Sequence, residues 1–380
     1  MQALSEFPYT IQTVYADLQD TVMQQAIPGV ELDMAQQMNV GALGAVGAIG
    51  TACKVIHGHR YWYAQYTDAS GRQQQSLLGA ESPAVLELVE HLRSTMSLDV
   101  LKHRRSMVGV LKKAGYAAPN RWASGALNIM ARVGLFKSGV TMIGTPAYGV
   151  IMNQMGFMDR QLTQTADVDF SFNSLKISVP ENVSLENILK ELHPKIFPVA
   201  GLDPREPPTS FHIAKSDFRV DVISNGDYAD EGKPVKVQQI GFCAAQMPFQ
   251  DFLTSGSVPS LVLTPYGCMV NVPTPGRMML HKIAASACRS HAFESKRRKD
   301  LRQANSLLLA LKQSRDFEID DAIAAIAQMR EPDLFAQKIH QGIKAGLSLG
   351  LEHMNDLLGR VANVPPAHDS EHDYWMPVRR

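Results

Sequence analysis

The chain has 380 residues, 45% of them hydrophobic, which is enough to bury the cores of two or three domains. Lysine plus arginine and aspartate plus glutamate balance at 37 each, so no global charge indicates a nucleic acid or membrane partner, and any anion-binding surface must be local. Its four cysteines form no C-x-x-C pair, and no run of about 18 apolar residues or signal-peptide pattern occurs, so we expect a reduced protein of the cytoplasm with no membrane partner.

Residues 10–40 have a helical pattern, followed by a small-residue stretch with glycines at 41, 44, 47 and 50. The glycine order matches neither dinucleotide-binding nor P-loop fingerprints, so it indicates a connector or close packing. Residues 51–79 then alternate aromatic and polar side chains around Asp68-Ala69-Ser70-Gly71. This pattern predicts a β-hairpin.

Basic and aromatic residues interleave on the predicted hairpin: Lys54, His57, His59, Arg60 and Arg72 with Tyr61, Trp62 and Tyr63. This mixture suits a nucleic-acid surface, although a small sheet that packs the aromatics into its own core gives the same pattern. The pattern of residues 82–107 predicts a helix. Basic residues at 102–105, 112 and 113 give this segment and its continuation a charged face. The first 115 residues are therefore interpreted as an accessory module.

Residues 140–170 predict a strand, a Gly144-Thr145 turn, a helix, and a second strand with Asp167 and Asp169. Alternate residues of a strand face the same way, so both carboxylates project together while Val168 and Phe170 enter the core. Paired carboxylates of this kind are typical ligands of Mg²⁺ or Mn²⁺.

A third carboxylate is predicted in the apolar strand FRVDVIS, residues 218–224, where Asp221 lies on the face opposite Val220 and Val222. Two carboxylates on one strand and a third on a neighbour can hold two metal ions. The Gly144-Thr145 turn offers backbone N–H groups and a hydroxyl at a helix N-terminus, which suits phosphate groups.

The order I-G-T-x-A-Y, helix, T-x-D-V-D-F and a strand with an isolated aspartate resembles the DNA polymerase β type nucleotidyltransferase superfamily. Within it, the chain resembles a bacterial subgroup of uncharacterised nucleotidyltransferase-fold proteins. Thr145 replaces the usual Ser or Gly, and 22 residues separate Gly144 from Asp167, more than in small members. The resemblance implies a mixed sheet with helices.

Two later phrases, V-P-T-P-G-R-M-M-L-H-K at 272–282 and K-R-R-K-D-L-R-Q-A at 296–304, resemble segments of the same subgroup. Similar Lys and Asp elements recur in AbiEii-like nucleotidyltransferase toxins, and a toxin role would imply an antitoxin partner. The resemblance implies that Lys282 contacts NTP phosphates and that Asp300 orients a base or activates the acceptor. Arg277 either binds an anion or caps the incoming helix. An i,i+4 ion pair with Lys296 would also explain Asp300.

Residues after 300 show helical spacing, and the polar tail is expected to be loosely ordered. The predicted fold class is α+β. Its predicted parts are an accessory module (1–115), a nucleotidyltransferase core (116–275), a helical domain (276–364) and a tail (365–380).

The resemblance predicts Mg²⁺- or Mn²⁺-dependent transfer of NMP from an NTP to a hydroxyl, with release of pyrophosphate. Catalytic residues would be Asp167, Asp169, Asp221 and Asp300; phosphate-binding residues would be Gly144, Thr145, Lys282 and Arg277. RNA, in particular a tRNA 3′ end, is the first expected acceptor. A protein, a small molecule, a non-catalytic nucleotide-binding regulator and a nucleic-acid-binding module are alternatives.

Overall fold

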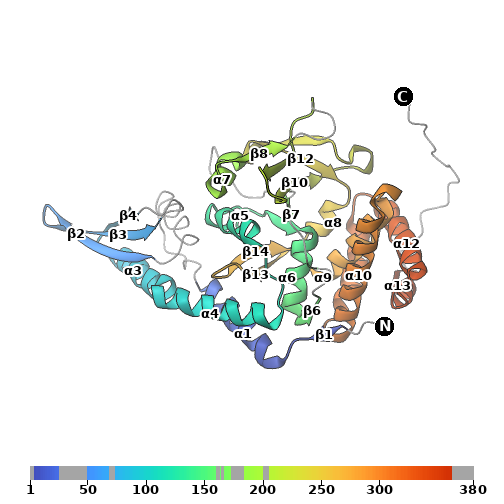
Figure 1. Ribbon diagram of the computed structural model, residues 1–380, viewed down its shortest axis with the longest axis horizontal. Helices are drawn as coiled ribbons and strands as arrows, with labels where there is room; N and C mark the ends of the chain where they lie inside the picture. The colour runs from blue at the N-terminus through green and yellow to red at the C-terminus, as the bar shows by residue number, and fades with distance from the viewer. Residues whose placement is uncertain are drawn as a thin grey trace. The chain divides into compact units, whose positions relative to one another are not determined.

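The computed structural model describes residues 4–24, 49–67, 73–159, 163, 167–172, 184–199 and 205–361. The chain divides into two compact units, Met1–Thr274 and Pro275–Arg380. The first unit combines sheets with helices and the second is helical in its described part, which confirms the predicted α+β class (Figure 1). No helix in the described part of the chain is long and apolar enough to cross a bilayer. The predicted division into three domains and a tail stays a prediction.

The first unit begins with helices and a small antiparallel sheet, whose described strands pair in the order β2-β3-β4. Turn residues His57 and Gly58 join β2 to β3 with φ angles of 51° and 81°, the left-handed values that a tight hairpin turn needs. The elements are α1 (Tyr9–Met23), β2 (Gly50–Ile56), β3 (His59–Thr67), β4 (Gln73–Ala80), α3 (Pro83–Met96) and α4 (Leu98–Ala114).

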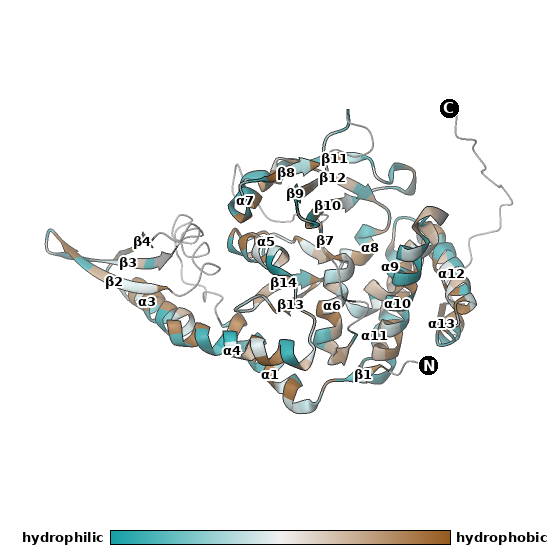
Figure 2. Cartoon of the chain, in the orientation of Figure 1, coloured by the Kyte–Doolittle hydropathy of each residue, from teal (hydrophilic) through white to brown (hydrophobic). Residues whose placement is uncertain are grey.

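The predicted helix 82–107 is observed as two helices, α3 and α4, each capped by a serine, and α4 continues to Ala114. The Ser82 hydroxyl accepts a hydrogen bond from the Val85 N–H at 3.2 Å, and Ser97, in extended conformation, caps α4 in the same way through Val100. Both helices carry apolar and polar faces, seen as brown and teal segments in Figure 2. The apolar face of α3 packs on the small sheet.

A larger mixed sheet forms the centre of the first unit, and its described strands follow the order β11-β12-β10-β7-β5-β14-β13, with β9 beside β10 and β8 beside β9. Val168, Phe170, Val220 and Val222 are buried, so one face of its central strands is core. The strands are β5 (Thr141–Ile143), β7 (Asp167–Ser171), β8 (Ile196–Val199), β9 (Ser210–Ile213), β10 (Arg219–Asn225), β11 (Pro234–Val237), β12 (Phe242–Met247), β13 (Val258–Val262) and β14 (Cys268–Val272).

The helices of this central region include α6, which follows β5 directly. They are α5 (Arg121–Arg132), α6 (Gly144–Met155), α7 (Leu185–Leu192) and α8 (Gln250–Thr254). Short 3₁₀ turns lie at Tyr228–Asp230 and Gln238–Ile240, and β1 (Ser5–Glu6) pairs with β6 (Phe157–Met158).

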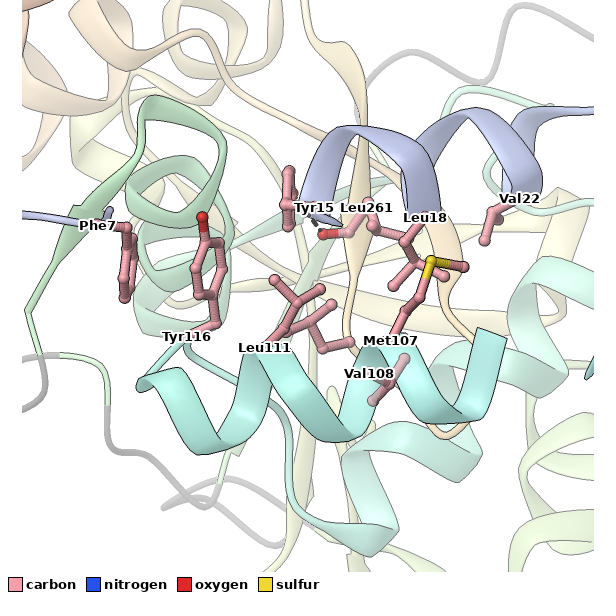
Figure 3. Close-up of a cluster of buried hydrophobic side chains, with 10 residues drawn as sticks. Phe7, Tyr15, Leu18, Val22, Met107, Val108, Leu111, Tyr116 and Leu261 are labelled. Carbon is pink, nitrogen blue, oxygen red and sulfur yellow. Dashed lines mark hydrogen bonds between the residues drawn. The ribbon is translucent and has the colours of Figure 1, made fainter. Parts of the chain in front are cut away.

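An apolar cluster connects α1 and α4 to strand β13 within the first unit (Figure 3). The Phe7 and Tyr116 rings stack at 3.8 Å, and the buried Tyr15 hydroxyl donates a hydrogen bond of 3.0 Å to the Leu261 carbonyl. Leu18 and Leu111 are fully buried in the same cluster. This packing fixes the N-terminal helices on the central sheet.

The second unit is a group of helices packed around α9. Glycines permit close approach: a Cβ on Gly276 would overlap the Glu318 carbonyl, and one on Gly342 would overlap the Ile283 carbonyl. The helices are α9 (Pro275–Cys288), α10 (Glu294–Ser314), α11 (Phe317–Ala324), α12 (Pro332–Ser348) and α13 (Met354–Val361), with 3₁₀ turns at His291–Phe293 and Ala325–Gln328.

Several sequence predictions concern residues outside the described part. The antiparallel pairing of β3 with β4 confirms the predicted hairpin, but its predicted turn at 68–71 and Arg72 lie outside the described residues. The same holds for the glycines at 41, 44 and 47 and for the tail at 365–380. The predicted helix 10–40 is observed as α1, and residues 25–40 lie outside the described part.

Leu18→Ala should lower the free energy of unfolding by about 2–5 kcal/mol, because it leaves a cavity in the cluster between α1, α4 and β13. Urea denaturation measures the change. Asp17→Ala, an exposed position next in the chain, is the matched control and should stay within about 0.5 kcal/mol of the unaltered protein. Equal effects of the two substitutions would contradict the assigned core.

Candidate active site

The register of two parallel strands brings the predicted carboxylates together. On β7 and β10, Asp169 is the direct partner of Asp221, and Asp167 is the partner of Arg219. Paired residues on adjacent strands share a face, with about 4.8 Å between the strands. Asp167, Asp169 and Asp221 therefore project from one small area of the central sheet, opposite the buried Val168 and Val220.

The start of α6 lies against the same carboxylates. Ile143 on β5 pairs with Asp169, and Gly144 then begins α6 with a φ of 71°. A Cβ on Gly144 would overlap Oδ2 of Asp169 and stand 3.1 Å from its Cγ. Only glycine, which has no Cβ and tolerates this φ, lets the helix begin so close to the carboxylate.

The N-terminus of α6 carries a partial positive charge, which favours a ligand of negative charge. Its capping position is Ile143, which supplies no side-chain hydrogen bond, and Gly144 and Thr145 follow as the first helical residues. The first N–H groups of a helix have no acceptor within it, and the helix dipole is positive there. The structure thus places the predicted phosphate-binding turn beside Asp169.

Asp221 already has a cationic neighbour. The Arg219 Nε donates to Asp221 Oδ1 at 2.6 Å, and both side chains are partly exposed. In the described part of the chain, no three His, Cys, Asp or Glu side chains surround one metal-sized point. The donor set still fits a divalent cation, since carboxylate oxygens are its preferred ligands.

Strand β9 adds two further polar residues to the carboxylate face, the buried Ser210 and the partly exposed His212, which the sequence patterns did not reveal. On β9, Ser210 pairs with Asp221 and His212 pairs with Arg219, which places both on the carboxylate face. Phe211 and Ile213, the alternate residues, are buried. The alternation of polar and apolar residues could have predicted this strand from the sequence. The strand was missed because it is short and follows a turn-rich stretch.

A cavity of about 260 Å³ opens beside Asp167, between α5, α6 and the sheet. Most of its lining is small or apolar, including Ala117, Pro146 and Val168. Asn153 on α6 holds the lining loop through two hydrogen bonds with the Ala117 backbone, 2.8 and 2.9 Å long. The first aspartate therefore borders an apolar space as well as the polar site.

The predicted residues Lys282 and Asp300 lie in the second unit and bind each other. The Lys282 Nζ is 3.2 Å from Asp300 Oδ1, and the Arg289 Nε, which the sequence patterns did not single out, is 2.7 Å from Asp300 Oδ2. Burial alone would raise the pKa of Asp300, but Lys282 and Arg289 outweigh it and hold this pKa below its usual range. Arg277 is half-buried in the first turn of α9.

A family model described as nucleotidyltransferase matches residues 122–328, more than half of the chain. The chain belongs to this nucleotidyltransferase family. The match contains the Gly144-Thr145 turn, all three carboxylates and the Lys282–Asp300 pair, and it confirms the resemblance to nucleotidyltransferases. No curated protein and no solved structure matches the chain. The narrower resemblance to AbiEii-like toxins stays a prediction.

Gly144→Ala should cost more stability than Gly134→Ala, because only the first substitution meets a neighbour. Both glycines have a left-handed φ, 71° and 79°, but a Cβ at Gly134 has nothing within 4 Å. Gly134→Ala should cost about 1–2 kcal/mol from backbone strain alone. In an Asp169→Ala background, Gly144→Ala should lower the free energy of unfolding by no more than Gly134→Ala does, as measured by urea denaturation. An unchanged loss of stability in that background would contradict the assigned contact between Gly144 and Asp169.

Asp300→Asn should destabilise the protein by about 3–5 kcal/mol at neutral pH, because Lys282 and Arg289 lose their buried counter-charge. Since the folded pKa of Asp300 is lowered, its contribution is complete above the usual carboxyl pKa of about 3.9 and is lost as the pH falls through the lowered value. Denaturation at several pH values should show that the difference in free energy of unfolding between the unaltered protein and Asp300→Asn narrows only at acid pH. Asp321→Asn, at an exposed position, serves as the control. A stability difference for Asp300→Asn that does not change with pH would exclude the assigned ion pairs of Asp300.

Proposed function

We propose that the protein transfers a nucleoside monophosphate from an NTP to a hydroxyl group and releases pyrophosphate, in a reaction that depends on Mg²⁺ or Mn²⁺. Membership of the nucleotidyltransferase family supports transfer from an NTP in general. The observation that carries the proposal is the placement of Asp167, Asp169 and Asp221 on one face, with the N-terminus of α6 beside them.

Asp167 and Asp169 would hold both metal ions, and Asp221 would share the ion nearer the acceptor hydroxyl. When bound, such ions lower the pKa of the attacking hydroxyl and neutralise the charge that builds on the phosphates. Asp221 would also orient the acceptor hydroxyl. Arg219 keeps the Asp221 carboxylate on this face through its 2.6 Å hydrogen bond.

Gly144 and Thr145 would grip the β and γ phosphates. The glycine would offer its backbone N–H, and the threonine its N–H and hydroxyl, as donors at the positive end of α6. Because the same residues approach Asp169, the phosphates would lie beside the carboxylates that hold their counter-ions.

Lys282, Asp300 and Arg277 stay predicted participants. Lys282 is buried and paired with Asp300, so a contact with NTP phosphates would require this pair to open. Asp300 holds two cations and has a lowered pKa, which makes it a weak proton acceptor. An acceptor-activating role would therefore require it to give up part of this ion-pair network.

RNA, in particular a tRNA 3′ end, is the acceptor we propose first, because the small sheet presents basic and aromatic side chains. A protein side chain or a small hydroxylated molecule is the alternative acceptor. The toxin role with an antitoxin partner and the cytoplasmic location stay predictions.

Incubation with each α-³²P-NTP, Mg²⁺, total bacterial RNA and protein extract should place label in an RNA band. Asp167→Ala/Asp169→Ala should reduce this labelling by at least about 100-fold, the magnitude expected when a major electrostatic stabiliser of the transition state is lost. Asp217→Ala, an exposed aspartate just before β10, is the control and should label normally. Products are resolved on a gel.

Equal labelling by the unaltered and double-alanine proteins would refute the proposed site. Label in a protein band would indicate that the acceptor is a protein. Metal-dependent NTP binding with no label in any macromolecule would favour a small-molecule acceptor or a nucleotide-binding regulator.

A further inference from the structure

The two faces of the small sheet β2-β3-β4 have different surroundings. On one face, Trp62, Ala64 and Leu78 are buried against α3, where they pack with Leu88 and Leu92. The Trp62 indole N–H also donates to Glu81 Oε2 at 3.0 Å. At these positions the face is core, which accounts for part of the aromatic content of the segment, although Val55 on the same face is 69% exposed.

The opposite face, here called the open face, carries the other aromatic residues. Strand register pairs Lys54 with Tyr61 and Tyr63 with Leu77, and paired residues share a face. The Lys54 Nζ lies 4.6 Å from the centre of the Tyr63 ring and donates to Gln75 Oε1 at 2.7 Å. All three strands therefore contribute to one surface on which Tyr61 and Tyr63 are partly exposed.

The charge of this sheet is of one sign. The sequences of β2, β3 and β4 contain no aspartate or glutamate, whereas Lys54 and the exposed His59 stand among the residues of the open face. Ile56 and Leu77 are exposed on the same face at 41% and 47%. A surface that combines flat aromatic rings, apolar side chains, a lysine and an imidazole that can hydrogen-bond is complementary to bases linked by phosphates.

We propose that the open face binds a single-stranded segment of RNA, whose bases stack on Tyr61 and Tyr63 while its phosphates contact Lys54 and His59. The two tyrosines are two residues apart on β3, so their α-carbons are about 7 Å apart and each ring can take its own base. That the bound RNA is the acceptor rests on the proposed nucleotidyl transfer. The binding itself does not depend on it.

Helix α4 offers a continuation of the binding surface toward the central sheet. Its exposed Lys102, Arg105 and Lys112 fall within one side of the helix, and Asp99 in its first turn is its acidic residue. The helix ends just before Ala117, which lines the cavity beside Asp167. A strand bound on the small sheet would thus meet further cations on the segment that leads to the carboxylates.

The test measures binding of a fluorescent single-stranded oligoribonucleotide to the full chain carrying Asp167→Ala/Asp169→Ala, so that no transfer alters the RNA. Tyr61→Leu/Tyr63→Leu should weaken binding by at least about 10-fold, because each stacked base loses its aromatic partner. The matched control is Tyr9→Leu, which alters a tyrosine that is 83% exposed on α1 and should leave the Kd unchanged.

Lys54→Gln provides a second variant that keeps the tyrosines. It should weaken binding and reduce the slope of log Kd against log salt concentration by about 0.7, the value for one phosphate contact on a single strand. Lys236→Gln removes an exposed lysine from β11 and should change neither quantity. Circular dichroism of every variant separates lost binding from lost folding.

If the folded Tyr61→Leu/Tyr63→Leu and Lys54→Gln variants bind RNA as tightly as the protein without these substitutions, the proposal is overturned, whatever the transfer assay shows. Weakened binding in these variants, with no label transfer by the unaltered enzyme, would support the RNA surface and refute the proposed activity. If the open-face variants transfer label to RNA with an unchanged kcat/KM, the proposed activity is supported. The open face is then rejected as the site that binds the acceptor.

Discussion

The candidate site depends on the close approach of the Asp169 carboxylate to the α-carbon of Gly144. Strand β5 pairs with β7 so that Ile143 lies opposite Asp169, and the chain must turn into α6 at the next residue. A side chain at that residue would occupy the space of the carboxylate. Glycine therefore allows the positive end of a helix and a pair of carboxylates to share one corner of the sheet, where a metal-bound triphosphate would be stabilised from both sides.

The carboxylate strands could be predicted from the sequence because their pattern is local. Asp167 and Asp169 alternate with Val168 and Phe170, and Asp221 lies between two valines, so burial of the apolar face determines which way the carboxylates point. The Gly144 turn was predictable for the same reason, from a strand followed directly by glycine and a helical pattern. The register that pairs Asp169 with Asp221 required the structure, since it joins residues 52 positions apart.

What the sequence did not reveal depends on long-range pairing or on an unusual turn. Strand β9 reaches the site through its pairing with β10, and Arg289 joins Asp300 only after α9 and α10 pack together. The turn at His57-Gly58 escaped prediction because its sequence is not the Asn-Gly or Asp-Gly dipeptide that usually signals such a turn. The aromatic segment was predicted as a nucleic-acid surface or a core. The structure packs Trp62 into a core and leaves Tyr61 and Tyr63 partly exposed on the opposite face, and nucleic-acid binding stays a prediction.

The family match begins at residue 122, so it contains the carboxylates and leaves the small sheet and α4 outside. The apolar cluster of α1, α4 and β13 fixes this N-terminal part on the central sheet. A net charge of zero for the whole chain is compatible with a locally basic open face, because strands β2, β3 and β4 contain no aspartate or glutamate. Under the proposed function, the region that the family model matches would carry the NTP chemistry, and the N-terminal part outside it would recognise the acceptor.

A crystal structure with Mn²⁺ and a non-hydrolysable NTP analogue, with the metal located by anomalous scattering, tests the central claim most directly. The account predicts Mn²⁺ bound by Asp167, Asp169 and Asp221, with the terminal phosphates at the backbone of Gly144 and Thr145. Nucleotide and metal bound elsewhere, with the three carboxylates uncoordinated, would contradict it.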